Sequence, residues 1–246
     1  MRSTIRSIIS PLVPQRIKKL KRNFKLRIYR NRNKKRLVKD VFTRVYREND
    51  WGGKVGDFCS GSGSNEYLAS IYADMVKNFI KERHISTIVD LGCGDFVVGR
   101  KLLEEGIIYI GVDIVDELVE RNRSTFSNAN VSFVSLDIIS DPLPEGELCL
   151  IRQVFQHLSN SQIVEVINKL GNYKYVLITE HYPSDHLHMI PNKGKPHGGD
   201  TRIVDNSAVY LDLPPFNMKI LRKMLEVEVP PIVMKGEKII TYWVSV

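Results

Sequence analysis

Two aspartates, each at the end of an apolar run, have the spacing that most clearly indicates chemistry in this chain. Asp90 precedes the turn formed by Gly92 and Gly94, and Asp113 follows nineteen residues after Gly94, at the end of a second apolar run. Glycines at a strand exit let the backbone turn sharply and approach a ligand closely, because they carry no Cβ. A carboxylate about 20 residues beyond such a turn suits the two hydroxyls of a ribose. The pattern therefore indicates a nucleoside pocket, for either a dinucleotide or S-adenosylmethionine.

The spacing of the glycines favours S-adenosylmethionine. A dinucleotide fingerprint requires a third glycine where Val97 stands, and Gly99 comes two residues too late. Asp90 would repel a pyrophosphate, whereas it could balance a cationic amino group or a sulfonium.

The segments 89–94, 111–114 and 131–138 together resemble the class I S-adenosylmethionine-dependent methyltransferases. The resemblance implies an α/β, Rossmann-like fold with a mostly parallel seven-stranded sheet, helices on both faces, an antiparallel C-terminal hairpin and, here, an N-terminal helical extension. It also implies that Gly92 and Gly94 lie under the methionine moiety, Asp113 binds the ribose and Asp137 faces the adenine edge. The full set of expected cofactor-binding residues is Asp90, Gly92, Gly94, Asp113, Ile114, Asp137, Ile138 and Arg152.

Hydrophobic periodicity predicts the remaining elements. Residues 15–49 have a mostly helical pattern, a Gly- and Ser-rich loop follows at 51–64, and a helix capped by Ser64 extends to about Arg83. Strands and helices then alternate, which predicts a parallel sheet covered on both faces. We expect strands at 86–91, 107–113, 131–136, 147–152 and 174–180, helices at 97–105, 115–123 and 160–170, and two final strands at 224–229 and 238–244. The chain divides into a basic helical arm (1–40) and a methyltransferase domain (41–246), which has an N-terminal cap (41–83) and an acceptor loop (181–217).

Two histidines near the predicted ends of the fourth and fifth strands are the candidates for a catalytic base. His181 directly follows the predicted strand 174–180, at the rim where the acceptor must approach, and His157 precedes the helix at 160–170. Histidine can accept a proton from a hydroxyl near neutral pH. Arg152 emerges from an apolar strand and needs a partner, which could be the carboxylate of the cofactor or an anionic group of the substrate.

A narrower resemblance concerns the acceptor side. Segments 51–64, 152–160, 179–181, 199–202 and 213–216 look like a bacterial subfamily of class I methyltransferases that is associated with surface-polysaccharide gene clusters. On this basis we expect Trp51, Glu180, His197, Asp200 and Arg202 to bind the substrate. The spacing of His186, His188, His197 and Asp200 matches no metal-ligand motif, so we assign no metal site.

The positive charge of the chain is concentrated in the arm. Fifteen of the 36 Lys and Arg residues lie in residues 1–40, which contain one acid, so the chain's net charge of +8 becomes about −6 over 41–246. Ile17, Leu20, Phe24 and Ile28 recur at helical spacing among these cations. Residues 1–36 could lie on an anionic membrane surface, bind nucleic acid, or form a helix that packs on the domain. Three cysteines without paired spacing and no apolar span long enough for a bilayer favour the cytoplasm, with peripheral placement at the inner face of the cell membrane.

The sequence thus predicts a methyltransferase that acts on a hydroxyl or phosphate-type oxygen of a sugar in a surface polysaccharide or its precursor. The alternative enzyme is a tRNA or rRNA methyltransferase that holds RNA with its arm, although nucleic-acid binding is disfavoured because the arm offers few aromatic residues for base stacking. An alternative of another class is a non-catalytic subunit that binds the cofactor. The sequence does not indicate the oligomeric state.

Overall fold

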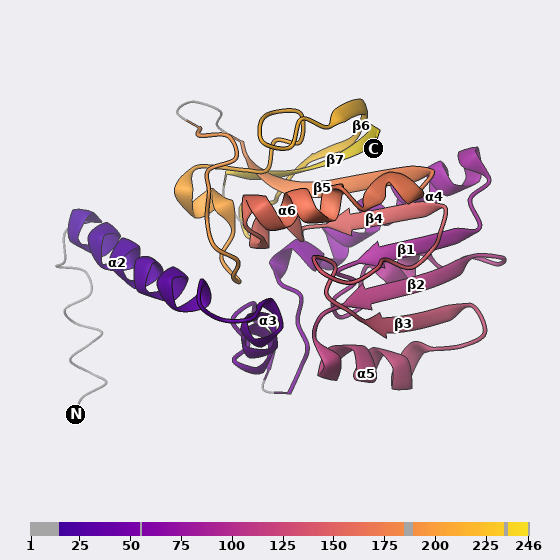
Figure 1. Cartoon of the computed structure of the whole chain (residues 1–246), viewed down its shortest axis with the longest axis horizontal. Helices are drawn as coiled ribbons and strands as arrows, with labels where there is room; N and C mark the ends of the chain where they lie inside the picture. The colour runs from indigo at the N-terminus through magenta and orange to yellow at the C-terminus, as the bar shows by residue number, and fades with distance from the viewer. Residues whose placement is uncertain (1–14, 55, 185–188, 234–235, 246) are drawn as a thin grey trace.

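The computed structural model describes residues 15–54, 56–184, 189–233 and 236–245, and its centre is a seven-stranded sheet (Figure 1). The strands follow the spatial order β3-β2-β1-β4-β5-β7-β6. β1 to β5 pair in parallel, whereas β7 pairs antiparallel with both β5 and β6. The bounds are β1 Thr87–Leu91, β2 Ile108–Asp113, β3 Val131–Ser135, β4 Leu148–Arg152, β5 Tyr175–Pro183, β6 Lys219–Glu228 and β7 Glu237–Ser245. This topology confirms the predicted fold class, and it sets the carboxyl ends of β2, β1 and β4 side by side.

The central strands are buried on both faces, because their alternate side chains enter two different hydrophobic clusters. Ile88 and Leu148 pack with helix α4 on one face. Val89 and Cys149 pack with helices α3 and α6 on the other. The helices are α2 Gln15–Asn33, α3 Val38–Arg47, α4 Glu66–Arg83, α5 Asp116–Phe126 and α6 Asn160–Ile167, and the 3-10 turns are η2 Ser62–Ser64, η3 Gly99–Leu102, η4 Phe155–His157, η5 Leu170–Asn172 and η6 Arg202–Asp205.

Several predicted boundaries were wrong. Strand β6 begins at Lys219, five residues before the start expected at 224, because its pairing with β7 begins there. The helix expected at 97–105 is only the short turn η3, because Asp95 bonds the Val97 amide (3.2 Å) and the ring of Phe96 turns into the core at φ 65°. Helix α4 is capped by Asn65, whose side chain accepts from the Leu68 amide at 3.1 Å, and not by Ser64. Strand β5 continues to Pro183 instead of ending at residue 180, because β7 pairs with it over that whole length.

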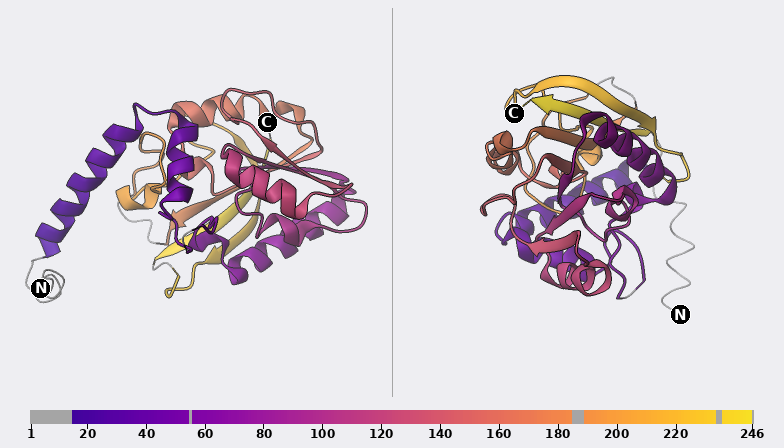
Figure 2. Two further views of the ribbon diagram at one scale, coloured as in Figure 1. Left: turned by 90° about the horizontal axis from the view of Figure 1, so that it is seen from below. Right: turned by 90° about the vertical axis from the view of Figure 1, so that its right-hand side faces the viewer.

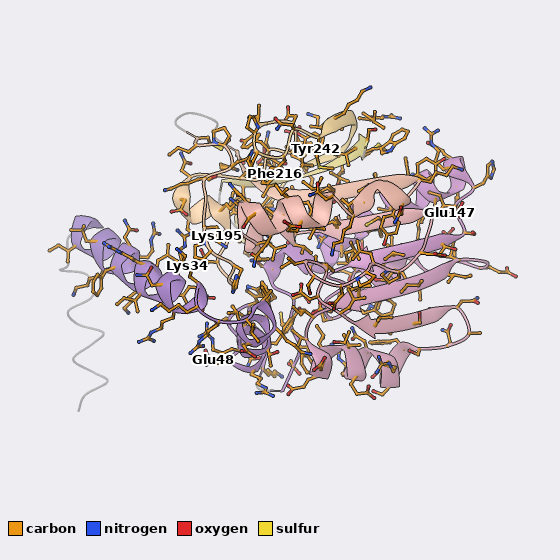
Figure 3. All side chains as sticks on the ribbon, in the orientation of Figure 1. Lys34, Glu48, Glu147, Lys195, Phe216 and Tyr242 are labelled. Carbon is orange, nitrogen blue, oxygen red and sulfur yellow. The ribbon has the colours of Figure 1, made fainter. Side chains whose placement is uncertain are left out.

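Helix α2 extends away from the domain and meets it only at its C-terminal end (Figures 1 and 2). Side chains along its outer part are surrounded by open space in Figure 3. Residues 1–14 of the predicted arm lie outside the described residues. Among the helices that the structure describes, none is both long and apolar enough to cross a membrane.

Candidate active site

A cavity lies where the carboxyl ends of β1, β2 and β4 meet helix α3. It encloses about 1010 Å³ of space between atoms, including its opening to solvent. Its walls come from α3, the turn after β1, the ends of β2 and β4, and the loop after β3. The lining residues are Val38, Phe42, Tyr46, Trp51, Ser60, Ser64, Tyr72, Asp90, Gly92, Cys93, Gly94, Asp95, Val98, Asp113, Ile114, Leu136, Asp137, Ile138, Ile139, Arg152, Gln153, Val154, His157 and Leu158. All eight residues expected to bind the cofactor are among them.

The glycine turn after β1 passes close to two other parts of the wall. Gly92 has φ 82°, and a Cβ there would lie 2.4 Å from Cγ2 of Val154. Gly94 has φ 56°, and a Cβ there would lie 2.3 Å from Oγ of Ser60. Positive φ and close approach both require glycine at these positions. The turn therefore packs closely against Val154 and Ser60, which line the same cavity.

Asp90 is a buried carboxylate beneath this turn. It is 7% exposed and accepts a 2.5 Å hydrogen bond from the Tyr109 hydroxyl. Burial raises the pKa of Asp90 to about 6, although the Tyr109 bond and the positive charge of Arg152 oppose the rise. An ionised Asp90 is thus under-compensated, and a cation bound in the cavity would stabilise it.

Asp113 ends β2 on the opposite side of the turn. Its two carboxylate oxygens accept from the amides of Gly94 and Val115, at 3.1 Å each. Burial also raises the pKa of Asp113 to about 6. These bonds fix the carboxylate in place and use one acceptor site on each oxygen, so a pair of hydroxyls could still bind it.

The wall beyond Asp113 is largely apolar. Ile114 and Ile138 line it, and Asp137 stands beside them with one oxygen accepting from the Ile139 amide at 2.9 Å. This arrangement would hold an adenine between aliphatic side chains while Asp137 faces its polar edge.

Arg152 finds its main partners within the protein. Its guanidinium donates to the Gly63 carbonyl at 2.6 Å and lies over the Tyr72 ring, 5.1 Å from the centroid. Burial lowers the pKa of Arg152. Its buried Nε has no hydrogen-bond partner among the residues that the structure describes. Because Arg152 lines the cavity, this donor is available to a bound carboxylate.

His157 lies on the acceptor side, against an aromatic wall. Its ring is 4.9 Å from the Trp51 ring and 6.2 Å from the Phe42 ring, centroid to centroid. Nδ1 lies 3.2 Å from the Gly198 carbonyl, which can only accept, so Nδ1 carries the proton. Nε2 is then the acceptor, and Nε2 of Gln156 lies 3.4 Å from it. Burial, helped by the charge of Lys195, lowers the pKa of His157 to about 3. The imidazole is therefore neutral at physiological pH.

His181 does not line the cavity. It was expected directly after β5, but it lies within that strand, paired with Ile239 of β7. Its ring is 3% exposed and Nδ1 bonds Glu237 at 2.8 Å. The position gives no support to a role as catalytic base.

Glu180 is also buried away from the cavity. Its two oxygens accept from the amides of Phe155 (2.8 Å) and Gln156 (3.1 Å), at the start of η4. Burial raises the pKa of Glu180 to about 8. It holds the turn that carries His157, so its contacts are structural and not with a substrate.

Three residues expected on the acceptor loop point elsewhere. His197 lies between Gln162 and the Arg36 carbonyl, 3.1 Å from each. Asp200 accepts from Arg30. Arg202 is 1% exposed and donates to the carbonyls of Lys193 and Leu158. The expectation that Arg202 binds the substrate is therefore not supported, because its guanidinium already binds backbone carbonyls.

Of the five residues expected to bind the substrate, Trp51 alone lines the cavity. Sequence reasoning missed Val38, Phe42 and Tyr46, which face the cavity from successive turns of α3. Their i, i+4, i+8 spacing was a usable signal. It also missed Asp95, which accepts from the Ser60 amide at 2.9 Å and so ties the Gly- and Ser-rich loop to the cavity.

The described residues contain no group of three or more His, Cys, Asp or Glu side chains placed to hold a metal ion. His186 and His188 lie outside the described part of the chain.

Comparison with known proteins finds one matching family model and several similar structures. A family model described as a methyltransferase domain matches residues 88–173. The chain is similar to human N-acetylserotonin methyltransferase in complex with S-adenosylmethionine, with 15% identity and a TM-score of 0.50 over 84% of this chain and 59% of that one, so it spans less than two thirds of that protein. It is also similar to magnesium protoporphyrin IX methyltransferase from Synechocystis PCC 6803 with bound S-adenosylhomocysteine, with 13% identity and a TM-score of 0.51 over 85% of this chain and 100% of that one. A further similarity is to N-methyltransferase NodS from Bradyrhizobium japonicum WM9 in complex with S-adenosylhomocysteine, with 11% identity and a TM-score of 0.54 over 83% of this chain and 97% of that one. No similar sequence is found among curated proteins.

Residues 88–173 thus match a methyltransferase domain, and the chain has the S-adenosylmethionine-dependent methyltransferase fold, as expected from the sequence. The cavity fits this cofactor on its own chemistry. The unpartnered Nε of Arg152 suits a carboxylate, and the under-compensated Asp90 suits a cation.

Proposed function

We propose that the protein transfers a methyl group from S-adenosylmethionine to an oxygen of a sugar in a surface polysaccharide or its precursor. The observation that carries this proposal is one continuous cavity. It joins the carboxylates Asp90 and Asp113 at strand ends to an aromatic wall formed by Trp51 and His157.

On the cofactor side, charge complementarity orients the ligand. Asp90 balances the positive charge of the amino and sulfonium groups, Asp113 accepts from the ribose hydroxyls, and Arg152 donates to the carboxylate. The cofactor supplies a methyl group that is electrophilic because it is bonded to a sulfonium. Each of these contacts also fixes the position of that methyl group relative to the aromatic wall.

On the acceptor side, the residues position a hydroxyl. The neutral His157 carries its lone pair on Nε2, where the hydroxyl of an acceptor would replace the long 3.4 Å contact from Nε2 of Gln156. A hydroxyl bonded there would have its oxygen lone pair aimed at the methyl group. The Trp51 ring offers a flat apolar surface on which the C–H face of a sugar can pack. Orientation of this kind can supply about 7–11 kcal/mol of the barrier. With a pKa of about 3, His157 contributes mainly through orientation.

Helix α2 supports placement at a membrane. Leu26, Tyr29, Arg30 and Asn33 lie toward the domain and are partly or fully buried. At 100° per residue, the apolar stripe is on the opposite side of the helix. Ile17, Leu20, Phe24 and Ile28 are 42%, 67%, 65% and 38% exposed. The stripe therefore does not pack on the domain, and the cations beside it suit anionic lipid. We infer a cytoplasmic protein that lies at the inner face of the cell membrane.

The function is tested by following label from methyl-labelled S-adenosylmethionine. Purified protein is incubated separately with nucleotide-linked sugars, with a lipid-linked glycan fraction, and with tRNA and rRNA. Label in a sugar fraction supports the proposal, and label in RNA would replace it with the RNA methyltransferase. Cofactor binding without transfer to any fraction would favour a non-catalytic subunit.

Membrane contact is tested with anionic vesicles and a charge-matched pair of variants. Phe24→Glu places a carboxylate on the stripe, and Asn23→Glu places the same charge off it. Phe24→Glu should reduce co-sedimentation with phosphatidylserine vesicles far more than Asn23→Glu does, and equal binding would contradict the contact. Point substitution is preferable to removing residues 1–36, because Arg30 contacts the domain.

A further inference from the structure

The inner face of α2 is tied to the loop that follows β5. Arg30 donates to Asp200 from Nε (2.9 Å) and Nη2 (2.7 Å), and Nη2 also pairs with Asp205 at 2.6 Å. These three side chains are only 16%, 11% and 15% exposed. One arginine thus anchors both ends of the segment 200–205 to the helix.

Between this anchor and the cavity lies the dipeptide Gly198-Gly199. The Gly199 amide donates to the Tyr29 hydroxyl at 2.9 Å, and the Gly199 carbonyl accepts from Nε1 of Trp51 at 2.9 Å. The Gly198 carbonyl accepts from Nδ1 of His157 at 3.2 Å, and its amide donates to the His157 carbonyl at 2.9 Å. Helix α2 therefore contacts the dipeptide through Tyr29, and the rings of Trp51 and His157 donate hydrogen bonds to its two carbonyls.

Both glycines are closely approached by their neighbours. A Cβ on Gly198 would lie 2.8 Å from Nδ2 of Asn33, and a Cβ on Gly199 would lie 3.0 Å from Cγ2 of Val45. The packing leaves the dipeptide little room to shift without moving the rings that it bonds.

We propose that Tyr29 and Arg30 are positioning residues for the acceptor, and that the last turns of α2 are part of the catalytic unit rather than of a separable arm. Tyr29 and Arg30 hold Gly198-Gly199, and the two carbonyls of this dipeptide set the orientation of His157 and Trp51. That these rings receive an acceptor rests on the proposed function. The chain of hydrogen bonds from helix α2 to the two rings does not depend on it.

The indole proton of Trp51 reports this link directly, because its hydrogen bond to Gly199 is the last step of the chain of contacts. The protein has two tryptophans, so its spectrum contains two indole N–H signals, which Trp243→Phe assigns. The test compares the solvent-exchange rate of the Trp51 indole proton in Tyr29→Phe, Arg30→Ala, Arg30→Lys and the exposed control Arg27→Ala. Thermal midpoint and S-adenosylmethionine affinity are measured on the same samples.

Loss of one buried hydrogen bond should speed exchange of the Trp51 proton roughly fivefold in Tyr29→Phe, and by more in Arg30→Ala. Arg30→Lys should recover part of the protection, and Arg27→Ala should match the wild type. S-adenosylmethionine affinity should stay within about twofold, since neither residue lines the cofactor side. Unchanged exchange in both Tyr29→Phe and Arg30→Ala would overturn the proposal. A wild type that binds no S-adenosylmethionine would instead refute the proposed function and leave the exchange result standing.

Discussion

Replacing Asp90 by Asn should stabilise the protein without cofactor and weaken its binding of S-adenosylmethionine. Asn keeps an oxygen that can accept the Tyr109 hydroxyl but never carries a charge. The pKa of Asp90 rises from its usual value of 3.8 to about 6, chiefly because of burial. A pKa difference of one between the folded and unfolded states corresponds to ~1.36 kcal/mol, so the ionised Asp90 carboxylate destabilises the fold by at most about 3 kcal/mol.

The sign of this effect depends on pH. Between pH 4 and 6 the folded state retains the Asp90 proton while the unfolded state loses it, so the stability of the wild type falls as pH rises through this window. Near pH 4 the protonated Asp90 and an Asn are equivalent in charge. The free energies of unfolding of wild type and Asp90→Asn should therefore be similar near pH 4, diverge between pH 4 and 6, and differ most above pH 6, with the variant more stable.

Urea denaturation without cofactor at several pH values measures this difference, and calorimetry measures cofactor affinity. A charge pair about 4 Å apart is worth about 4 kcal/mol at an effective dielectric constant of 20 before desolvation, so we expect the variant to lose about ten- to a hundredfold in affinity. A variant that is less stable than wild type at pH 7.5, or one that binds the cofactor equally well, would refute the reasoning.

Three further predictions follow from the cavity walls. His157→Ala should lower kcat for methyl transfer at least about tenfold, whereas His181→Ala should leave kcat near the wild-type value, and the reverse result in steady-state assays would reverse the assignment. Gly92→Ala should weaken S-adenosylmethionine binding, measured by calorimetry, whereas Gly106→Ala should not. Both glycines have φ 82°, but only at Gly92 would the added Cβ meet a neighbour, Val154. Equal effects of the two substitutions would show that backbone strain alone matters. Affinity for S-adenosylmethionine should fall as pH drops below about 6, where Asp90 and Asp113 take up protons, and a flat titration curve between pH 5 and 8 would contradict their raised pKa values.

The cofactor side of the cavity was predictable because its determinants are local in the chain. Gly92, Gly94 and Asp113 belong to a turn and a strand end, and the order of parallel strands brings such ends together. The structure places all of the expected cofactor-binding residues around one cavity. Their roles stay predictions until ligand binding is measured.

The acceptor side was harder to predict because it is assembled by contacts between distant segments. The rings of Trp51 and His157 bond the carbonyls of residues 198–199, more than forty positions further along the chain from His157. The antiparallel pairing of β7 extends β5 by three residues, which buries His181 inside the sheet. Arg202 was expected to bind the substrate, but its partners are backbone carbonyls that no motif encodes. Residues 29–36 were assigned to a separate arm, because a helix rich in cations gives no sign of which few side chains contact the domain.

The most direct test of the account is calorimetric titration of the purified protein with S-adenosylmethionine, comparing wild type, Asp113→Ala and the exposed control Asp74→Ala. Asp113→Ala removes the acceptor for two ribose hydroxyls, and hydrogen bonds to a charged group are worth roughly 1.5–3 kcal/mol each, so the affinity should fall at least about tenfold. Asp74→Ala should bind as the wild type does. A wild type that does not bind S-adenosylmethionine, or a folded Asp113→Ala variant that binds it equally well, would contradict the assignment of this cavity as the cofactor site.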